Sequence, residues 1–370
     1  MNTSLRDKFY GCICGAHIGS AMGAVVEGWP YARVEEKYGT LDRLLPYEHY
    51  NNGWLREAGT TEDGIDRQKL MITAIIEKGD RVNAEDVRRI WCRDIQPGAA
   101  AGISEPFEGE LLALARTHIP ARDLGKYCDY AGLNSFARAC HPIGLINAGD
   151  IRGAIEDIFE VGQLYQTSNS RGLKWACVTG VGIAAATKPG ATVDSVIGDI
   201  FDNLGERAHV PGRDDGWYAD YAGTNIVDEI GAALKLTSSC TDFRQLRAAF
   251  DTLYNGVGMP YAMSYANEIL TKAVCIFKMT GGNLKETIIA AVNLGRDTDC
   301  IAAVASGLAG ALDGTSSLPQ EWIDQVNHAT SVQRYTNNKR NLREHADGLY
   351  TAYKKRLARM RTFADEMDIE

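Results

Sequence analysis

Apolar residues recur at helical spacing along most of the chain. Six segments show the pattern most clearly: 71–79, 105–115, 173–188, 226–236, 268–278 and 283–294. Side chains three or four positions apart lie on one face of a helix, so the pattern predicts helices with one buried face. Alternating stretches rich in β-branched residues, which are typical of strands, are scarce. We therefore expect an all-α protein, folded as a single domain over residues 1–370.

Glycine stands at every fourth position of the first predicted helix, at Gly11, Gly15, Gly19 and Gly23. These positions share one helix face, and each glycine costs a helix about 1 kcal/mol relative to alanine. A second stretch, 301–312, is dominated by alanine, glycine and serine. Close approach of two backbones would offset the cost. We therefore expect these two helices to pack tightly near the centre, as part of a site or simply as core.

Composition narrows the classes of partner. The net charge of -9 argues against a general nucleic-acid binder, which needs a basic surface. Nine cysteines occur without a CxxC pair or a regular framework, which favours free thiols in a reducing cytoplasm. We identify no apolar run long enough to cross a membrane. We therefore expect neither a nucleic acid nor a membrane as partner.

The C-terminal segment differs from the rest of the chain. Lysine and arginine are frequent between Tyr335 and Arg361. We expect residues 335–370 to form a charged helical extension that faces solvent, with an oligomer contact as the alternative.

Two acidic clusters stand at the starts of predicted helices, each after a glycine and each with a threonine. The first is TTEDGID, residues 60–66, and the second is GRDTDC, residues 295–300. Threonine and aspartate cap helices well, so one such cluster would be explained as an N-cap. Two clusters with more acid than a cap requires instead predict a site for a hard divalent cation, which takes oxygen ligands.

Four stretches together resemble the ADP-ribosylglycohydrolase superfamily: GCICGAHIGSAMGAVVEG, TED, NLGRDTDCIAAVASGLAGALDG and LPQEW. The resemblance runs from about Tyr10 to Trp322. It implies an orthogonal helical bundle with a central cleft that holds Mg²⁺ or Mn²⁺, and hydrolysis of the bond from a ribose anomeric carbon to nitrogen or oxygen. By position, it assigns as metal ligands Thr61, Glu62, Asp63, Asp297 and Asp299. It also places Glu27, at the end of the first helix, near the substrate.

Four positions depart from the pattern of this superfamily. Ser20 and Glu62 stand where aspartate is usual, and Gly64 and Cys300 stand where a further threonine is usual. A thiol is a soft ligand and a poor one for Mg²⁺. Hydroxyl ligands are therefore lost, and we expect two metal ions, or one if the change has altered a site.

Cleavage of a glycosidic bond places positive charge on the sugar ring in the transition state. A carboxylate that orients or deprotonates water then serves as general base. Glu27 and Glu62 are the candidates for this catalytic role.

Two segments in the middle of the chain carry candidates for substrate binding. Asn134 and His141 fall where the superfamily has an asparagine-rich substrate loop, and for His141 we favour support of the loop over substrate contact. Ser168 and Arg171 precede a predicted helix whose N-terminus suits a phosphate, although helix capping explains them equally well.

A third segment, residues 210–223, combines glycines, aromatic residues and acids. It predicts a loop over a cleft in which Trp217 and Tyr218 stack on a base. A surface loop without a role is the alternative.

Three functions fit this sequence. The first is metal-dependent hydrolysis of an ADP-ribosylated protein or another ADP-ribose conjugate. The second is hydrolysis of a smaller N-riboside or glycosidic metabolite by the same chemistry. The third is a catalytically inactive binding or structural protein on the same fold. The two acid clusters argue against the third, because like charges held together destabilise one another unless a cation intervenes.

Overall fold

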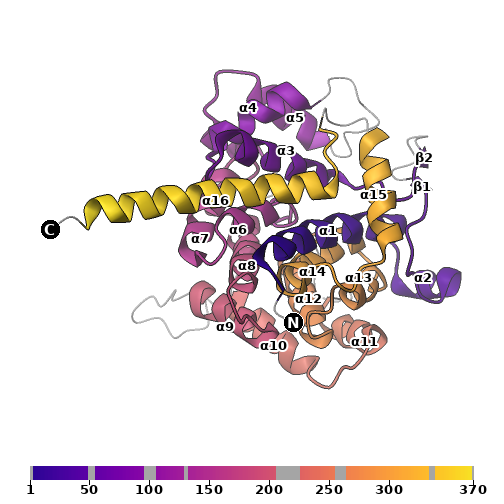
Figure 1. The fold of residues 1–370 in the computed structure, drawn as a ribbon. Coiled ribbons are helices and arrows are strands. Elements are labelled where there is room, and N and C mark those ends of the chain that lie inside the picture. The colour runs from indigo at the N-terminus through magenta and orange to yellow at the C-terminus, as the bar shows by residue number, and fades with distance from the viewer. Residues whose placement is uncertain are drawn as a thin grey trace, which may run out of the picture.

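The protein is helical throughout the part that the computed structural model describes, which is residues 3–48, 55–95, 106–128, 132–205, 226–254, 264–332 and 338–368 (Figure 1). Within these ranges, the strand structure is one antiparallel pair, β1 (Tyr47–Glu48) with β2 (Leu55–Arg56). The all-α prediction is confirmed.

Each of the six periodic segments lies in a helix: α3, α5, α8, α10, α12 or α13. The elements in chain order are α1 (Leu5–Gly23), the 3-10 turn η1 (Ala24–Val26), α2 (Tyr31–Tyr38), α3 (Asp63–Lys78), α4 (Ala84–Asp94), α5 (Pro106–Ala115), the 3-10 turn η2 (Ala121–Tyr127), α6 (His141–Ile146), α7 (Ile151–Gly162), α8 (Arg171–Ala186), α9 (Val193–Leu204), α10 (Ile226–Leu236), α11 (Phe243–Tyr254), α12 (Ala266–Met279), α13 (Leu284–Val292), α14 (Thr298–Asp313), α15 (Gln320–Val332) and α16 (Leu342–Met367).

Helices α1 and α14 lie side by side in the core and run antiparallel (Figure 1). A Cβ atom at Gly19 would lie 2.7 Å from the carbonyl oxygen of Ala302, and one at Gly23 would lie 2.5 Å from that of Thr298. Side chains do not tolerate such distances, so only glycine permits this approach. The predicted close packing is confirmed. It brings the end of α1 beside the start of α14.

Helix α1 corrects one expectation. The stretch Leu5–Val26 is long and apolar enough for a membrane span, with a mean hydropathy of 1.4. All of the apolar window in this stretch is buried against the rest of the chain. The helix is apolar on every side because it is surrounded by other helices.

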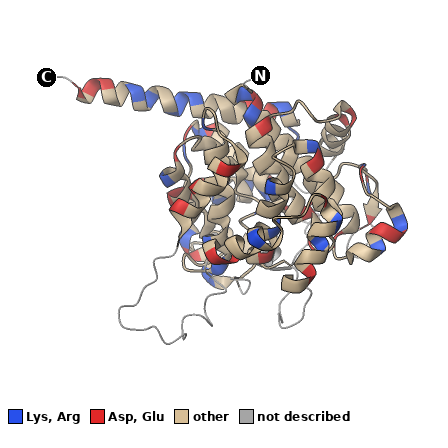
Figure 2. Cartoon of the chain, turned by 90° about the horizontal axis from the view of Figure 1, so that it is seen from below, with Lys and Arg blue, Asp and Glu red and all other residues tan. Residues whose placement is uncertain are grey.

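Only the last turns of helix α16 agree with the prediction from composition, which is a charged helix that faces solvent. The first part of α16 packs into the fold and buries Leu342, His345 and Leu349. Its last turns project from the body, with charged side chains along them, and leave Phe363 65% and Met367 70% exposed (Figures 1 and 2). The solvent-facing prediction is wrong for the first part, because apolar residues at helical spacing there outweigh the lysines and arginines on the opposite face.

The α1–α14 contact predicts a large effect of a single methyl group. In Gly15→Ala, the new Cβ would collide with the backbone of Ser306, so we expect a loss of about 1–3 kcal/mol in the free energy of unfolding. In the control Gly198→Ala on α9, the Cβ meets nothing within 4 Å, and we expect a gain of about 0.5–1 kcal/mol from helix propensity. Urea unfolding measures both. Equal effects would contradict the close packing.

Candidate active site

The downstream acid cluster is fixed to the end of α1 by a short backbone ladder. The Gly28 N–H donates to the carbonyl of Arg296, and the Arg296 N–H donates to that of Trp29, both at 2.8 Å. Gly295 and Arg296 have φ values of 74° and 65°, in the left-handed region. This conformation is rare for a residue other than glycine. It turns the chain sharply, so that Asp297 begins α14 beside the segment that carries Glu27.

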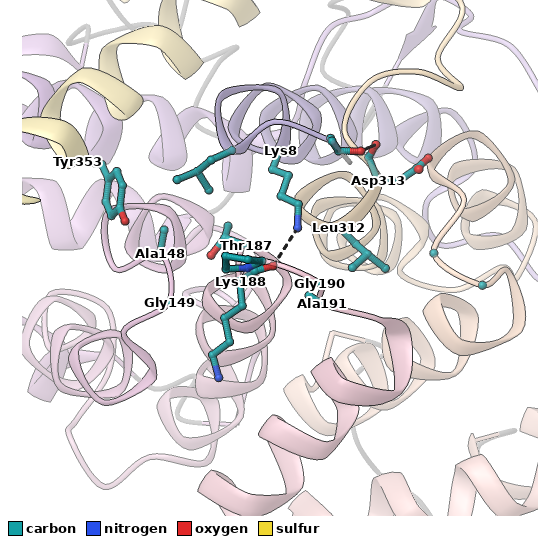
Figure 3. A pocket seen from close by; sticks show the side chains of 15 residues that line it. Lys8, Ala148, Gly149, Thr187, Lys188, Gly190, Ala191, Leu312, Asp313 and Tyr353 are labelled. Atoms are coloured by element: carbon teal, nitrogen blue, oxygen red, sulfur yellow. Dashed lines mark hydrogen bonds between the residues drawn. The ribbon is translucent and has the colours of Figure 1, made fainter. Parts of the chain in front are cut away.

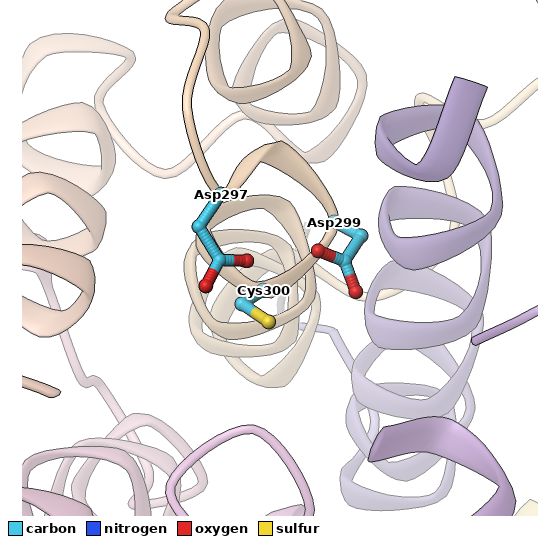
Figure 4. A group of neighbouring side chains, drawn as sticks. All are labelled: Asp297, Asp299 and Cys300. Atoms are coloured by element: carbon cyan, nitrogen blue, oxygen red, sulfur yellow. The ribbon is translucent and has the colours of Figure 1, made fainter. Parts of the chain in front are cut away.

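Asp297, Asp299 and Cys300 form the centre of this cluster, with one potential ligand atom from each lying within 4.8 Å of the others (Figure 4). Asp297 is the N-cap residue of α14, yet its side chain makes no capping hydrogen bond. The Oδ1 atoms of Asp297 and Asp299 are buried and accept no hydrogen bond from any described residue. Burial raises the pKa of Asp299 well above its usual range, and Asp297 raises it further. Helix capping therefore does not explain these acids, whereas a cation would satisfy them.

The upstream cluster lies at the start of α3 and is buried as well. Glu62 is the N-cap residue of α3 but, like Asp297, makes no capping hydrogen bond. The Tyr47 hydroxyl donates to Glu62 Oε1, and Arg56 Nε lies 3.5 Å from the same oxygen. Thr61 Oγ1 accepts a hydrogen bond of 2.9 Å from Lys69. These ligand candidates are thus held by groups of the protein itself.

Arg138 joins the two clusters. Its Nη2 donates to Asp63 Oδ2 at 2.5 Å, and Arg67 donates to the same oxygen at 3.3 Å. Its Nη1 lies 3.1 Å from Cys300 Sγ and 3.8 Å from Asp299 Oδ2. No local pattern in the sequence marks this arginine, which lies between Asn134 and His141 in the segment 134–144.

Glu27 follows η1 and is half-buried. Burial raises the pKa of Glu27 well above its usual range, and the negative charges of Asp299, Asp297 and Glu62 raise it further. The Glu27 carboxyl therefore interacts electrostatically with acids of both clusters. A carboxylate whose pKa is raised is a stronger base than an ordinary glutamate, as proton transfer requires.

Asn134 belongs to the same site. Its Nδ2 donates to Asp297 Oδ2 at 3.2 Å and to the carbonyl of Ser264 at 2.9 Å. Its Oδ1 is buried and has no hydrogen-bond partner among the described residues. An amide oxygen in this position adds a third oxygen of the kind that hard cations take.

His141 supports the helices around the site. It is fully buried; its Nδ1 accepts from Gln68, and its Nε2 donates to the carbonyl of Ala303 at 2.9 Å. The other end of Gln68 accepts from His17 Nε2 at 3.1 Å. The chain of contacts thus links α1, α3, α6 and α14. Both ring nitrogens of His141 thus have partners within the protein, while its role toward a substrate loop stays a prediction.

The start of α8 is capped by its own residues. Ser170 Oγ accepts from the Leu173 N–H at 3.2 Å, and Ser168 is exposed. The guanidinium of Arg171 lies 5.9 Å from the ring centre of Tyr265. Capping, by Ser170 instead of Ser168, therefore accounts for this helix start. Trp217 and Tyr218 lie outside the described residues.

A cavity of about 460 Å³ opens at the other end of α1 from the acid clusters (Figure 3). Its most buried charge is Lys8, which donates to the carbonyls of Ala186 at 2.7 Å and Lys188 at 3.3 Å. Lys8 thereby satisfies backbone oxygens at the end of α8. None of the predicted site residues lines this cavity.

The fold is shared with a solved structure described as an ADP-ribosylglycohydrolase-related protein complex, with a TM-score of 0.64 at 18% identity, over 95% of this chain and 98% of that one. The model of the ADP-ribosylglycohydrolase family matches residues 1–358, so the chain belongs to that family. Membership supports glycosyl hydrolase activity on ADP-ribose conjugates.

Two relatives show how distant the similarity is. An uncharacterized protein of Archaeoglobus fulgidus is 23% identical over 327 residues, which cover 86% of this chain and 92% of that protein. The ADP-ribosylarginine hydrolase Tri1 of Pseudomonas putida is 42% identical, but only over 52 residues, or 14% of each chain.

The His141 contacts predict a pH dependence of stability. Burial lowers the pKa of His141 to about 4, from an ordinary value of 6.5. Below pH 6.5, His141 therefore binds a proton in the unfolded chain but stays neutral in the folded chain. The free energy of unfolding therefore falls as the pH falls. Between pH 7 and pH 5, we expect this histidine to account for a loss of about 2 kcal/mol.

Urea unfolding at the two pH values tests this contribution. His141→Gln is expected to be less stable at pH 7 but to lose less stability on going to pH 5. The control His118→Gln changes an exposed histidine and is expected to leave the pH dependence unchanged. Equal pH dependence in wild type and His141→Gln would show that His141 is not held neutral.

Proposed function

We propose that this protein is a metal-dependent hydrolase that cleaves the glycosidic bond at the ribose anomeric carbon of ADP-ribosylated proteins or other ADP-ribose conjugates. The observation that carries the proposal is the pair of buried carboxylates, Asp297 and Asp299, whose Oδ1 atoms have no partner among the described residues. They lie beside Glu27 in a chain of this hydrolase family.

The downstream donor set fits Mg²⁺ or Mn²⁺. Asp297 and Asp299 would hold the ion, with the amide oxygen of Asn134 as a third donor. When bound, the ion would supply charge stabilisation and would orient a ribose hydroxyl and a water.

Glu27 is the group that we assign to accept the proton of water. It is half-buried, and its pKa is raised by burial and by the negative charges of Asp299, Asp297 and Glu62. Glu62 is assigned a positioning role instead, because Tyr47 and Arg56 already hold its carboxylate.

The proposed location is the cytoplasm. All nine cysteines are free thiols, which is the usual state in a reducing compartment. The local similarity to an ADP-ribosylarginine hydrolase makes ADP-ribosyl-arginine the first substrate to test. A smaller N-riboside is the second.

Binding of Mn²⁺ should raise the thermal unfolding midpoint. At about 100 times the dissociation constant, a ligand that binds only the folded state stabilises it by about 2.7 kcal/mol. Asp297→Asn is expected to abolish this shift. Asp313→Asn, at the opposite end of α14, is expected to keep it. If neither Mn²⁺ nor Mg²⁺ changes the thermal unfolding midpoint of the wild-type protein, the metal centre is refuted.

Turnover should depend on Glu27 and on the metal. With a panel of ADP-ribosyl-arginine, ADP-ribosyl-serine and simple nucleosides, wild type is expected to release ADP-ribose or ribose, and EDTA to stop the release. Glu27→Gln is expected to lower kcat by about 10²–10⁴, with the Mn²⁺-induced stabilisation retained. Cleavage of nucleosides alone would favour the smaller substrate. No cleavage of any riboside would support the inactive alternative.

A further inference from the structure

We infer that the guanidinium of Arg138 occupies the position of a second cation in this centre, so that the protein binds one exchangeable metal ion instead of two. The inference rests on the metal centre proposed above. It concerns how the cations are divided between the two acid clusters.

The contacts of Arg138 are those of a cation in a shared site. It is 6% exposed, and it bonds Asp63 of the upstream cluster while lying 3.8 Å from Asp299 of the downstream one. Breaking the buried Arg138–Asp63 ion pair would cost free energy, because the remaining charge would have neither its partner nor water to stabilise it. Asp63 is therefore bound to an arginine and not available to a metal ion.

The small residues Gly64 and Cys300 leave the space that the Arg138 side chain occupies. A Cβ atom at Gly64 would lie 2.6 Å from Arg138 Cδ, so the side chain passes through the space that any larger residue would fill. On its other side, the guanidinium meets the thiol of Cys300 at 3.1 Å. Gly64 and Cys300 are the two positions where the sequence lacks a threonine hydroxyl. Both changes face the same arginine.

The charge around the upstream cluster excludes a further cation. Three buried carboxylates lie there: Glu62, Asp63 and Asp66. They are met by four buried basic side chains: Arg56, Arg67, Lys69 and Arg138. Arg56, Arg67 and Lys69 match these acids in number, and Arg138, which the upstream cluster shares with Asp299, adds a fourth positive charge. A second ion between the two clusters would have to lie where the positive charge of Arg138 already is, in a region with little water.

The downstream cluster has the opposite balance. Asp297 and Asp299 each place a potential ligand atom within 4.8 Å of the other's, and Arg138 Nη1 lies 3.8 Å from Asp299 Oδ2. The Oδ1 atoms of both aspartates remain unpartnered among the described residues. Basic side chains of the protein therefore neutralise the upstream acids, and a metal ion is needed only at the downstream acids.

The test is the number of Mn²⁺ ions bound by the full chain. Elemental analysis and calorimetry on wild type are expected to give one ion, and electron paramagnetic resonance at saturation is expected to show an isolated Mn²⁺ without coupling to a neighbour. Arg138→Gln is expected to bind a second ion and to show a coupled pair. Arg67→Gln, which removes the other partner of Asp63 but does not reach Cys300, is the matched control and should still bind one.

The outcomes separate the inference from the proposed function. Two coupled ions in wild type would overturn the inference and leave a metal-dependent hydrolase standing. One ion in both wild type and Arg138→Gln would show that Arg138 is not the group that excludes the second. No ion in wild type would overturn the metal centre itself. The wild-type measurements alone decide how many ions the centre binds, even if Arg138→Gln fails to fold.

Discussion

A carboxylate taken out of water has to be neutralised by a cation or by a proton, and this requirement organises the centre of the molecule. Two sets of acids are buried at the starts of α3 and α14. The α3 set is neutralised from within, by side chains that the fold places around it. The α14 set is not, and the imbalance marks it as the place where something from solution has to bind. The difference between the two sets says more about function than the presence of acids does.

The close crossing of α1 and α14 determines where this imbalance arises. Because the glycines let the two backbones touch, the last residues of α1 and the first residues of α14 share one small volume. The hydroxyl of Thr298 reinforces the contact by donating to the carbonyl of Gly23 at 2.8 Å. Asp297 and Asp299 flank that threonine, so the residue that fixes the crossing also fixes the two acids around it.

Much of this architecture is predictable from the sequence, because it follows from short-range patterns. Helical spacing predicts the helices, and glycine at every fourth position predicts the crossing. The basic residues around the α3 acids could not be predicted. Arg67 and Lys69 stand four and three positions from Asp63 and Asp66, a spacing that is typical of exposed helical ion pairs. Only the tertiary fold shows that these pairs are buried.

The role of Arg138 could not be predicted from the sequence for a related reason. This arginine is 75 positions from Asp63 and 162 from Cys300, and no local pattern connects residues so far apart. The first part of α16 was misjudged because basic composition hid its apolar face. In each case, the missing information is which side of a helix other helices cover.

The crossing also has a consequence for the order of folding. Gly23 and Thr298 are 275 positions apart, so α1 leaves the ribosome long before its partner helix exists. Until α14 is synthesised, an apolar helix with the hydropathy of a membrane segment has no surface to pack against. Contacts of such long range form slowly, and exposed apolar helices aggregate or bind chaperones. The glycine face that gives the finished protein its centre therefore has no partner until α14, which begins at Thr298 of 370 residues, has emerged.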